Sequence, residues 1–325
     1  MATLYTHKSS NIWKTWLLMA VFLVLLVVVG YFASLYFGNV NILYIALIFS
    51  LFMNVLSYWY SDKIALSMSG ARAIDMKNAE EREIHNLLEN VSITAGLPTP
   101  RLFIIVDDAP NAFATGRNKE HGAVAVTTGL LKILDKSELE GVLAHELSHI
   151  GNRDTLLSTV VVILVGLVVI ISDMVTRSMF FGGRRDRDSD SQAGNILMIV
   201  GIVFIILSPI IASIIQLAIS RKREFLADST GALITRYPEG LANALRKISG
   251  YGAPMIHANN AMAHLYISNP FGAKATNGIA KMFMTHPPVE DRIKALLGEK
   301  AAQNMMGDKD SQNIAGENGA GKKVV

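Results

Sequence analysis

Residues 142–150 read Val-Leu-Ala-His-Glu-Leu-Ser-His-Ile, with His145 and His149 one helical turn apart. On a helix, this spacing directs both imidazoles to the same face, where they can bind one metal ion. Glu146 follows the first histidine directly and projects beside the pair, where a carboxylate can act as a general base on water. The neighbouring residues are apolar, so the histidines are expected to be buried and to need a polar partner. The segment therefore predicts a zinc site with Glu146 as the catalytic base.

The motif is flanked by long charge-free runs, which are Thr15–Ser61, Thr155–Ser172 and Ser191–Ser220. A membrane-spanning helix needs about 20 mostly apolar residues. Gly38-Asn39-Val40-Asn41 breaks the first run, so the sequence predicts four spans, near 16–37, 42–60, 156–175 and 195–220. The first apolar stretch is too long for a signal-peptide core, and no small-residue cleavage pattern follows it. We therefore expect it to be retained as an anchor.

The positive-inside rule orients these predicted spans. Lys8 and Lys14 precede the first span, and the connection to the second span carries no basic residue, which places residues 61–154 in the cytoplasm. The basic run 221–223 then marks the cytoplasmic end of the fourth span. The loop between the third and fourth spans is also rich in arginine, which leaves open a hairpin that packs at the membrane without crossing it.

A catalytic zinc ion takes three protein ligands, and the motif supplies two. Thr155 occupies the position at which an HExxHxxGxxH extension would place a third histidine. Glu224 is the candidate third ligand, because a membrane hairpin would bring residues just after 220 back beside His149. Asp228, one turn further on, could accept the free ring N–H of a zinc-bound histidine. Spacing alone leaves open that Glu224 and Asp228 form a solvated charged turn.

The remaining pattern predicts a helix at 77–95, strands at 101–106 and 123–128, a loop at 111–116, and a capping box in which Ser137 and Glu140 begin the motif helix. The fold class is thus an integral membrane protein, mainly α-helical with a small β-sheet, in which a zincin-like catalytic domain joins about four transmembrane helices. The predicted divisions are a membrane hairpin (1–60), a cytoplasmic part with the motif (61–154), a second membrane hairpin (155–220), a cytoplasmic helical part (221–298) and a disordered tail (299–325).

Three further residues are candidates for contacts with a substrate or a transition state. The strand at 123–128 is expected to be an edge strand that pairs with a peptide substrate, with Asn111 contacting the peptide backbone. His286 precedes Pro287, which favours an extended backbone, and it could donate a hydrogen bond to an oxyanion. An ordinary turn histidine is the alternative for His286. Asp228 completes this group as the predicted support of a zinc ligand.

Composition excludes other functions. The net charge is +3 without a basic block, which argues against nucleic acid as a partner. The chain contains 0 cysteines, so it forms neither disulfides nor thiolate metal sites. Polypeptide substrates and the lipid bilayer are the expected partners.

Several segments together resemble a known family: Asn111–Gly116, Thr127–Leu131, Glu138–His149, Ser220–Asp228, Thr285–Pro288 and Arg292. They are similar to the HtpX family of bacterial membrane-bound zinc metalloproteases, which is related to the CAAX prenyl proteases. The resemblance extends from the first predicted span to about residue 297.

The resemblance implies that His145, His149 and Glu224 bind one zinc ion per chain and that Glu146 is the catalytic base. It also implies an active site facing the cytoplasm at the bacterial inner membrane, and cleavage of misfolded or damaged membrane proteins during stress. Two alternatives stay open, a CAAX-type peptidase acting on prenylated substrates and a non-catalytic zinc-binding membrane scaffold. Glu146 argues against the scaffold, because a structural zinc site has four protein ligands and no use for a base.

Overall fold

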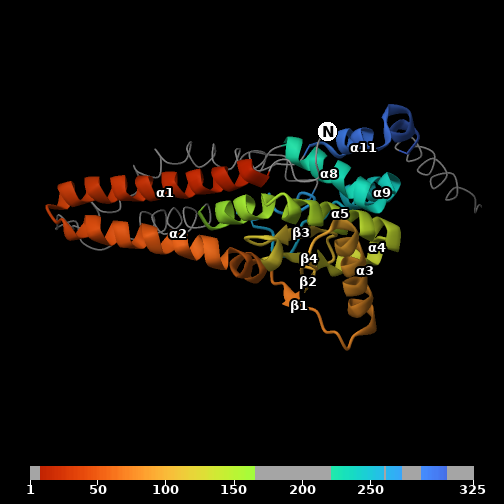
Figure 1. The fold of residues 1–325 in the computed structure, drawn as a ribbon, viewed down its shortest axis with the longest axis horizontal. Helices are drawn as coiled ribbons and strands as arrows, with labels where there is room; N and C mark the ends of the chain where they lie inside the picture. Colours follow the sequence, from red (N-terminus) through yellow and green to blue (C-terminus); the bar gives the residue numbers. More distant parts are fainter. Residues whose placement is uncertain (1–7, 165–220, 260, 273–286, 306–325) are drawn as a thin grey trace, which may run out of the picture.

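The computed structural model describes residues 8–164, 221–259, 261–272 and 287–305. In this part of the chain, a long helical hairpin extends from a body in which helices pack against a four-stranded sheet (Figure 1). The mainly α-helical character and the small sheet expected from the sequence are confirmed.

The hairpin consists of α1 (Lys8–Phe37) and α2 (Asn41–Met68). Gly38, at a φ of 62°, lies in the turn between them, where glycine adopts a left-handed backbone without a steric penalty. Both helices are long and apolar enough to cross a membrane, yet only 28% and 22% of their most apolar windows are buried inside the protein. A core helix of a soluble protein would be mostly buried. The exposed apolar surface therefore fits a lipid environment, and the predicted spans 16–37 and 42–60 fall within α1 and α2.

The third predicted span begins as the apolar helix Asp154–Leu164. Its side chains are largely buried with residues of α1 and α2, including Phe22 and Met53. The rest of this span, the arginine-rich loop and the predicted span at 195–220 lie outside the described residues.

The sheet contains β1 (Arg72–Ala73), β2 (Arg101–Ile105), β3 (Ala112–Thr115) and β4 (Ala123–Thr127), in the order β1-β2-β4-β3. β4 is parallel to β2 and antiparallel to β3. The predicted strands at 101–106 and 123–128 are thus confirmed, whereas the predicted loop at 111–116 contains strand β3.

β4 is a central strand, so the prediction of an edge strand at 123–128 is wrong. All of its residues are buried. Val124 and Val126 belong to the core beneath the body helices, whereas Ala123 and Ala125 belong to the core shared with the hairpin. A run of small apolar residues is what a strand covered on both faces requires. A substrate therefore cannot pair with β4, because both of its edges are already occupied.

The body helices are α3 (Ala79–Ala95), α4 (Thr128–Ile133), α5 (Lys136–Gly151), α8 (Arg221–Thr235), α9 (Pro238–Ser249) and α11 (Val289–Leu297). α3 ends at Ala95, where the helix predicted at 77–95 also ends, and Gly96 caps it with a φ of 66°. α5 is the central helix and packs against α8, α9, α3 and β3. In Figure 1, it runs between α8 and the sheet. The motif helix is therefore enclosed by elements from both halves of the chain.

The predicted start of the disordered tail at residue 299 is wrong. Residues 299–305 are helical, and Ala302 is buried beside Ile293 of α11. The apolar contact with α11 explains why this stretch is ordered. Residues 306–325 lie outside the described part of the chain.

Candidate metal centre

α5 begins with a capping box formed by Asp135 and Glu138. The Asp135 carboxylate accepts a bond from the backbone N–H of Glu138 at 2.9 Å, and the Glu138 carboxylate accepts one from the backbone N–H of Asp135 at 2.8 Å. The predicted box of Ser137 and Glu140 is wrong, because Ser137 instead donates to Asp135 at 2.7 Å. Lys247 of α9 also binds Glu138 at 2.6 Å. The helix that carries the histidines is thus fixed at its start by two independent contacts.

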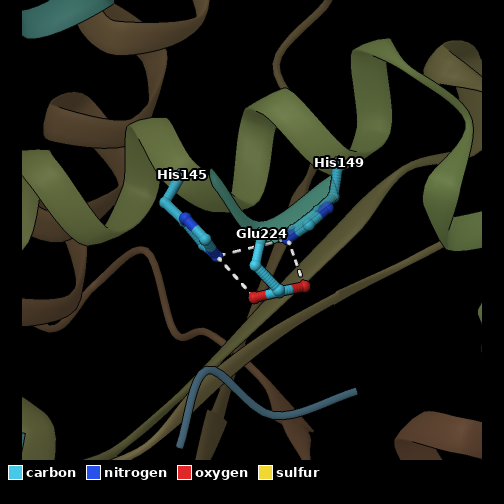
Figure 2. Close-up of side chains that lie close together, drawn as sticks. All are labelled: His145, His149 and Glu224. Carbon is cyan, nitrogen blue, oxygen red and sulfur yellow. Dashed lines mark hydrogen bonds and ion pairs between the residues drawn. The ribbon is translucent and has the colours of Figure 1, made fainter. Parts of the chain in front are cut away.

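Close packing of α8 on α5 brings Glu224 over the two histidines. A Cβ atom at Gly231 would lie 3.1 Å from the backbone nitrogen of His145 and 3.3 Å from its Cα. A larger residue there would push the two helices apart. Glu224 lies two turns before Gly231 on α8, and Figure 2 shows its carboxylate facing both imidazoles.

The three donor groups lie at distances that suit one metal ion. The Nε2 atoms of His145 and His149 are 3.2 Å apart. The Glu224 oxygens lie 3.9 Å from His145 Nε2 and 3.8 Å from His149 Nε2. Tetrahedral zinc with ligands at its usual bond lengths separates neighbouring donor atoms by about 3.4 Å. His145, His149 and Glu224 therefore fit a shared zinc ion, and the structure brings together the three residues predicted as ligands.

A buried ion pair supports His145 from behind. Asp228 Oδ1 lies 3.0 Å from His145 Nδ1. Arg292 of α11 binds the same carboxylate with two bonds, from Nε at 2.8 Å and from Nη2 at 2.6 Å. Arg292 also donates to the backbone carbonyl of Ile267 at 3.2 Å. Asp228 can thus accept the Nδ1–H of His145, which leaves the Nε2 lone pair for a metal.

A different carboxylate supports His149. Asp154 Oδ2 lies 3.0 Å from His149 Nδ1. Asp154 begins the helix that follows α5, and Arg153 before it has a φ of 57°. This turn directs the Asp154 side chain back toward the end of α5. His149, like His145, thereby has an acceptor for its Nδ1–H.

The two imidazoles titrate differently in this environment. Burial lowers the pKa of His145 to about 4, although Asp228 opposes this effect. Burial also disfavours the charged form of His149, but the carboxylates of Asp154 and Glu224 outweigh it and raise the pKa of His149 to about 9. The pair therefore favours a single positive charge, and His149 can share its Nε2 proton with the neutral His145. The donor set thus favours a cation between the two Nε2 atoms and Glu224.

Glu146 lies beside the donor set and is 1% exposed. Burial raises the pKa of its carboxyl group to about 7, against the opposing effect of His149. A carboxyl group with a pKa near neutrality can both accept and release a proton at physiological pH. The structure therefore provides a base next to the predicted metal position.

The other predicted residues have different outcomes. Asn111 bonds with Ser268 through both ends of its amide, donating to the carbonyl at 3.0 Å and accepting from the N–H at 3.2 Å. It therefore joins β3 to a segment of the same chain, in place of the predicted contact with a substrate. His286 lies outside the described residues. Asp228 lies where the sequence places it, one turn after Glu224 and in contact with His145.

The sequence interpretation missed two residues of the site. Asp154 has a recognisable signal, because it is the first carboxylate after His149 and a buried histidine needs an acceptor. Arg292 is part of the resemblance, but no local pattern connects it with Asp228. Its role follows only from the packing of α11 against α8.

Hydrolysis assisted by a metal requires a cation and a base at one place, and α5 provides positions for both. The exposed apolar hairpin indicates that the protein that carries this site is bound to a membrane. The fold and the site therefore define the class of membrane-bound metallohydrolases. The model of Peptidase family M48 matches residues 78–300. The chain belongs to this peptidase family.

Relatives with the name "Protease HtpX homolog" match almost the whole chain. The relative from Caldanaerobacter subterraneus subsp. tengcongensis is 46% identical over 298 residues, which is 90% of this chain and 97% of that protein. The relative from Thermoanaerobacter pseudethanolicus is 47% identical with the same coverage. The relative from Pyrococcus furiosus is 46% identical over 87% of this chain and 94% of that protein. The chain is therefore a membrane-bound metalloprotease.

Among solved structures, Ste24p from S. mikatae is a more distant likeness. Its TM-score is 0.44 at 16% sequence identity, and the match covers 79% of this chain and 58% of that chain. The family assignment rests on the sequence matches.

Proposed function

We propose that the protein is a zinc endopeptidase that holds one zinc ion through His145, His149 and Glu224 and uses Glu146 as its catalytic base. The observation that carries this proposal is the convergence of the three donor groups, with separations of 3.2, 3.8 and 3.9 Å, beside a buried carboxyl group. Two histidines and a glutamate form a known ligand set of catalytic zinc.

Zinc bound there would polarise the substrate carbonyl and make water a stronger nucleophile. Glu146 takes a proton from the attacking water and passes it to the leaving amine, for which a pKa of about 7 is suited. Asp228 and Asp154 keep His145 and His149 in the tautomer that presents Nε2 to the metal. His286 remains a predicted donor to the oxyanion.

The proposed substrates are misfolded or damaged membrane proteins, cleaved at the cytoplasmic face of the bacterial inner membrane. The position of the site supports this proposal. Asn11 of α1 bonds directly to Asp154, so the metal centre lies at the end of the hairpin that joins the body (Figure 1). A peptide that leaves the bilayer beside the hairpin would be within reach. The names of the relatives and the resemblance stated above support a role in protein quality control during stress.

The proposed organisation follows from the same arrangement. A membrane hairpin (1–60) carries a cytoplasmic part with the motif (61–154), and a second membrane segment (155–220) leads to the helical part (221–298) that provides the third ligand. α5 and α8, which come from the two cytoplasmic parts, pack directly against each other. The multi-pass topology is therefore compatible with a single site.

Cleavage of casein, an unfolded reporter, by the detergent-purified protein tests the zinc mechanism. Glu146→Ala is expected to retain zinc and to lower kcat by about 10²–10⁴-fold, because it removes the general base. His145→Ala is expected to lose both zinc and activity. Glu140→Ala is the matched control, since Glu140 lies on the same helix and is partly exposed. Cleavage that persists in Glu146→Ala, or that is indifferent to a chelator, would contradict the proposal.

Membrane orientation has a separate test, which the absence of cysteine from the chain makes simple. A single cysteine replaces either Ser229, exposed on α8, or Asn39, exposed in the hairpin turn. A membrane-impermeant thiol reagent is expected to label Ser229→Cys only from the cytoplasmic side and Asn39→Cys only from the other side. Labelling of both positions from one side would show that α1 and α2 do not cross the bilayer.

A further inference from the structure

Asn11 lies near the start of α1, yet its side chain is buried against the end of α5 and is 1% exposed. Its amide nitrogen donates to Oδ1 of Asp154 at 2.6 Å and to the backbone carbonyl of Asn152 at 3.1 Å. These two acceptors lie on either side of Arg153, where the chain turns with a φ of 57° into the next helix. One side chain of the hairpin therefore holds the turn that follows the motif.

Asp154 connects this turn to the metal centre. One carboxylate oxygen contacts His149 Nδ1 at 3.0 Å, while the other accepts the bond from Asn11. Arg223 contributes a longer ion pair with that second oxygen, at 3.6 Å. The bond from Asn11 is thus the shorter of the two contacts, and it fixes the direction in which the carboxylate faces His149.

Burial of the Asn11 amide costs free energy, so its presence at this position calls for a functional reason. Oδ1 of Asn11 is buried and has no hydrogen-bond partner among the described residues. A leucine of similar size would avoid an unpaired buried amide oxygen. Asn54 on α2 offers a comparison, because its Oδ1 is also buried without a partner in the described part of the chain, but its amide nitrogen bonds to Ser50 within the same helix. The two asparagines therefore differ mainly in whether they contact the support of a predicted ligand.

We propose that Asn11 is a positioning residue for the metal centre, acting through Asp154 on His149, so that docking of α1 sets the affinity of the site for zinc. This inference rests on the zinc site proposed above. Without Asn11, the Asp154 carboxylate can rotate away and the His149 imidazole loses its fixed orientation. The membrane hairpin then helps to position a zinc ligand in addition to anchoring the protein.

The experiment measures zinc affinity by competition with a chromogenic chelator, on the full-length protein in detergent. Asn11→Leu is expected to bind zinc about 10–100-fold more weakly, the usual effect of losing a residue that orients a metal ligand. Asn54→Leu, the matched control, is expected to bind zinc as the wild type does. At saturating zinc, kcat of Asn11→Leu should return toward the wild-type value, which a general folding defect would not allow.

Two further variants make the result decisive. Asn11→Asp keeps the size of the side chain but replaces its two N–H donors with a carboxyl group, which repels Asp154 when ionised and can donate only one hydrogen bond when protonated. It should therefore weaken zinc binding, and it tests the role of Asn11 even if Asn11→Leu fails to fold. In an Asp154→Asn background, Asn11→Leu should lower zinc affinity little further, because Asn11 acts on His149 through the Asp154 carboxylate.

The outcomes separate the two proposals. Wild-type zinc affinity in both Asn11 variants, together with loss of zinc in His145→Ala, would overturn the role of Asn11 and leave the metal site intact. Wild-type zinc affinity in His145→Ala would overturn the metal site and, with it, the role of Asn11.

Discussion

His145 and His149 come from one short motif, but the protein supports them in different ways. Behind His145, Asp228 is 0% exposed and is bound by Nε and Nη2 of the Arg292 guanidinium. Behind His149, Asp154 is 4% exposed, and its other oxygen meets one amide, from Asn11, and a longer ion pair. The first support is formed by helices of the body, whereas the second includes a residue of the membrane hairpin.

The pKa values of these residues also differ between the two supports. Burial disfavours the charged form of Asp228, but the Arg292 charge dominates and lowers the pKa of that carboxyl to about 2. Burial of the imidazole keeps the pKa of His145 at about 4 although Asp228 opposes this effect, whereas burial of the His149 imidazole is outweighed by Asp154 and Glu224, which raise the pKa of His149 to about 9. Two histidines of the same motif are thus supported by different kinds of contact. The support of His145 consists of body helices, whereas the support of His149 includes a contact with the membrane hairpin.

The largest expected effect is on the support of His145. Arg292→Leu leaves the Asp228 carboxylate fully buried without its cation, and loss of one partner of a buried ion pair destabilises a protein by about 3–5 kcal/mol. The measurement is the free energy of unfolding of the detergent-solubilised protein. Zinc affinity should fall as well, because Asp228 no longer has a fixed position.

An ion pair whose arginine is half exposed provides the control for this prediction. Arg72 also binds a carboxylate, that of Glu81, through both arms, but its side chain is 49% exposed. Arg72→Leu is therefore expected to cost no more than about 1 kcal/mol. Equal losses in Arg292→Leu and Arg72→Leu would show that burial does not distinguish the two pairs.

A second prediction compares the two aspartates directly. Asp228→Asn and Asp154→Asn should each lower zinc affinity by about 10–100-fold, because each weakens the acceptor that orients a histidine. Asp228→Asn removes the carboxylate that Arg292 binds twice, whereas Asp154→Asn removes only the 3.6 Å contact of Arg223, so Asp228→Asn should also reduce the unfolding free energy by the larger amount. Chelator competition and denaturant titration measure the two quantities. The comparison fails if Asp154→Asn proves as destabilising as Asp228→Asn.

The smallest expected effect concerns the helix that both histidines share. Asp135→Ala removes the cap of α5 and should cost about 1 kcal/mol of stability. Peptidase activity at saturating zinc should not change, because neither support is altered. Ser137→Ala should cost less, since Ser137 does not cap the helix. A larger loss of stability in Ser137→Ala than in Asp135→Ala would support the capping box of Ser137 and Glu140 that the sequence predicts.

Local patterns in the sequence predicted much of the fold and of the site. Helix α3, strands β2 and β4, and the hairpin α1–α2 all follow from hydrophobic periodicity, apolar length and turn residues. The structure also brings together the three predicted ligands. The central place of β4 was not predictable in this way, because a short run of small apolar residues does not reveal how many neighbours the strand has.

The sequence by itself determined the helical pair of histidines with its adjacent base and the two long apolar helices. Each of these features depends on residues within one helix. Only the tertiary structure decided which side chains hold the two aspartates that support the histidines. Arg292 reaches Asp228, and Asn11 reaches Asp154, from positions far away in the chain. Contacts of this kind depend on how helices pack after the chain has folded, and no local spacing encodes them.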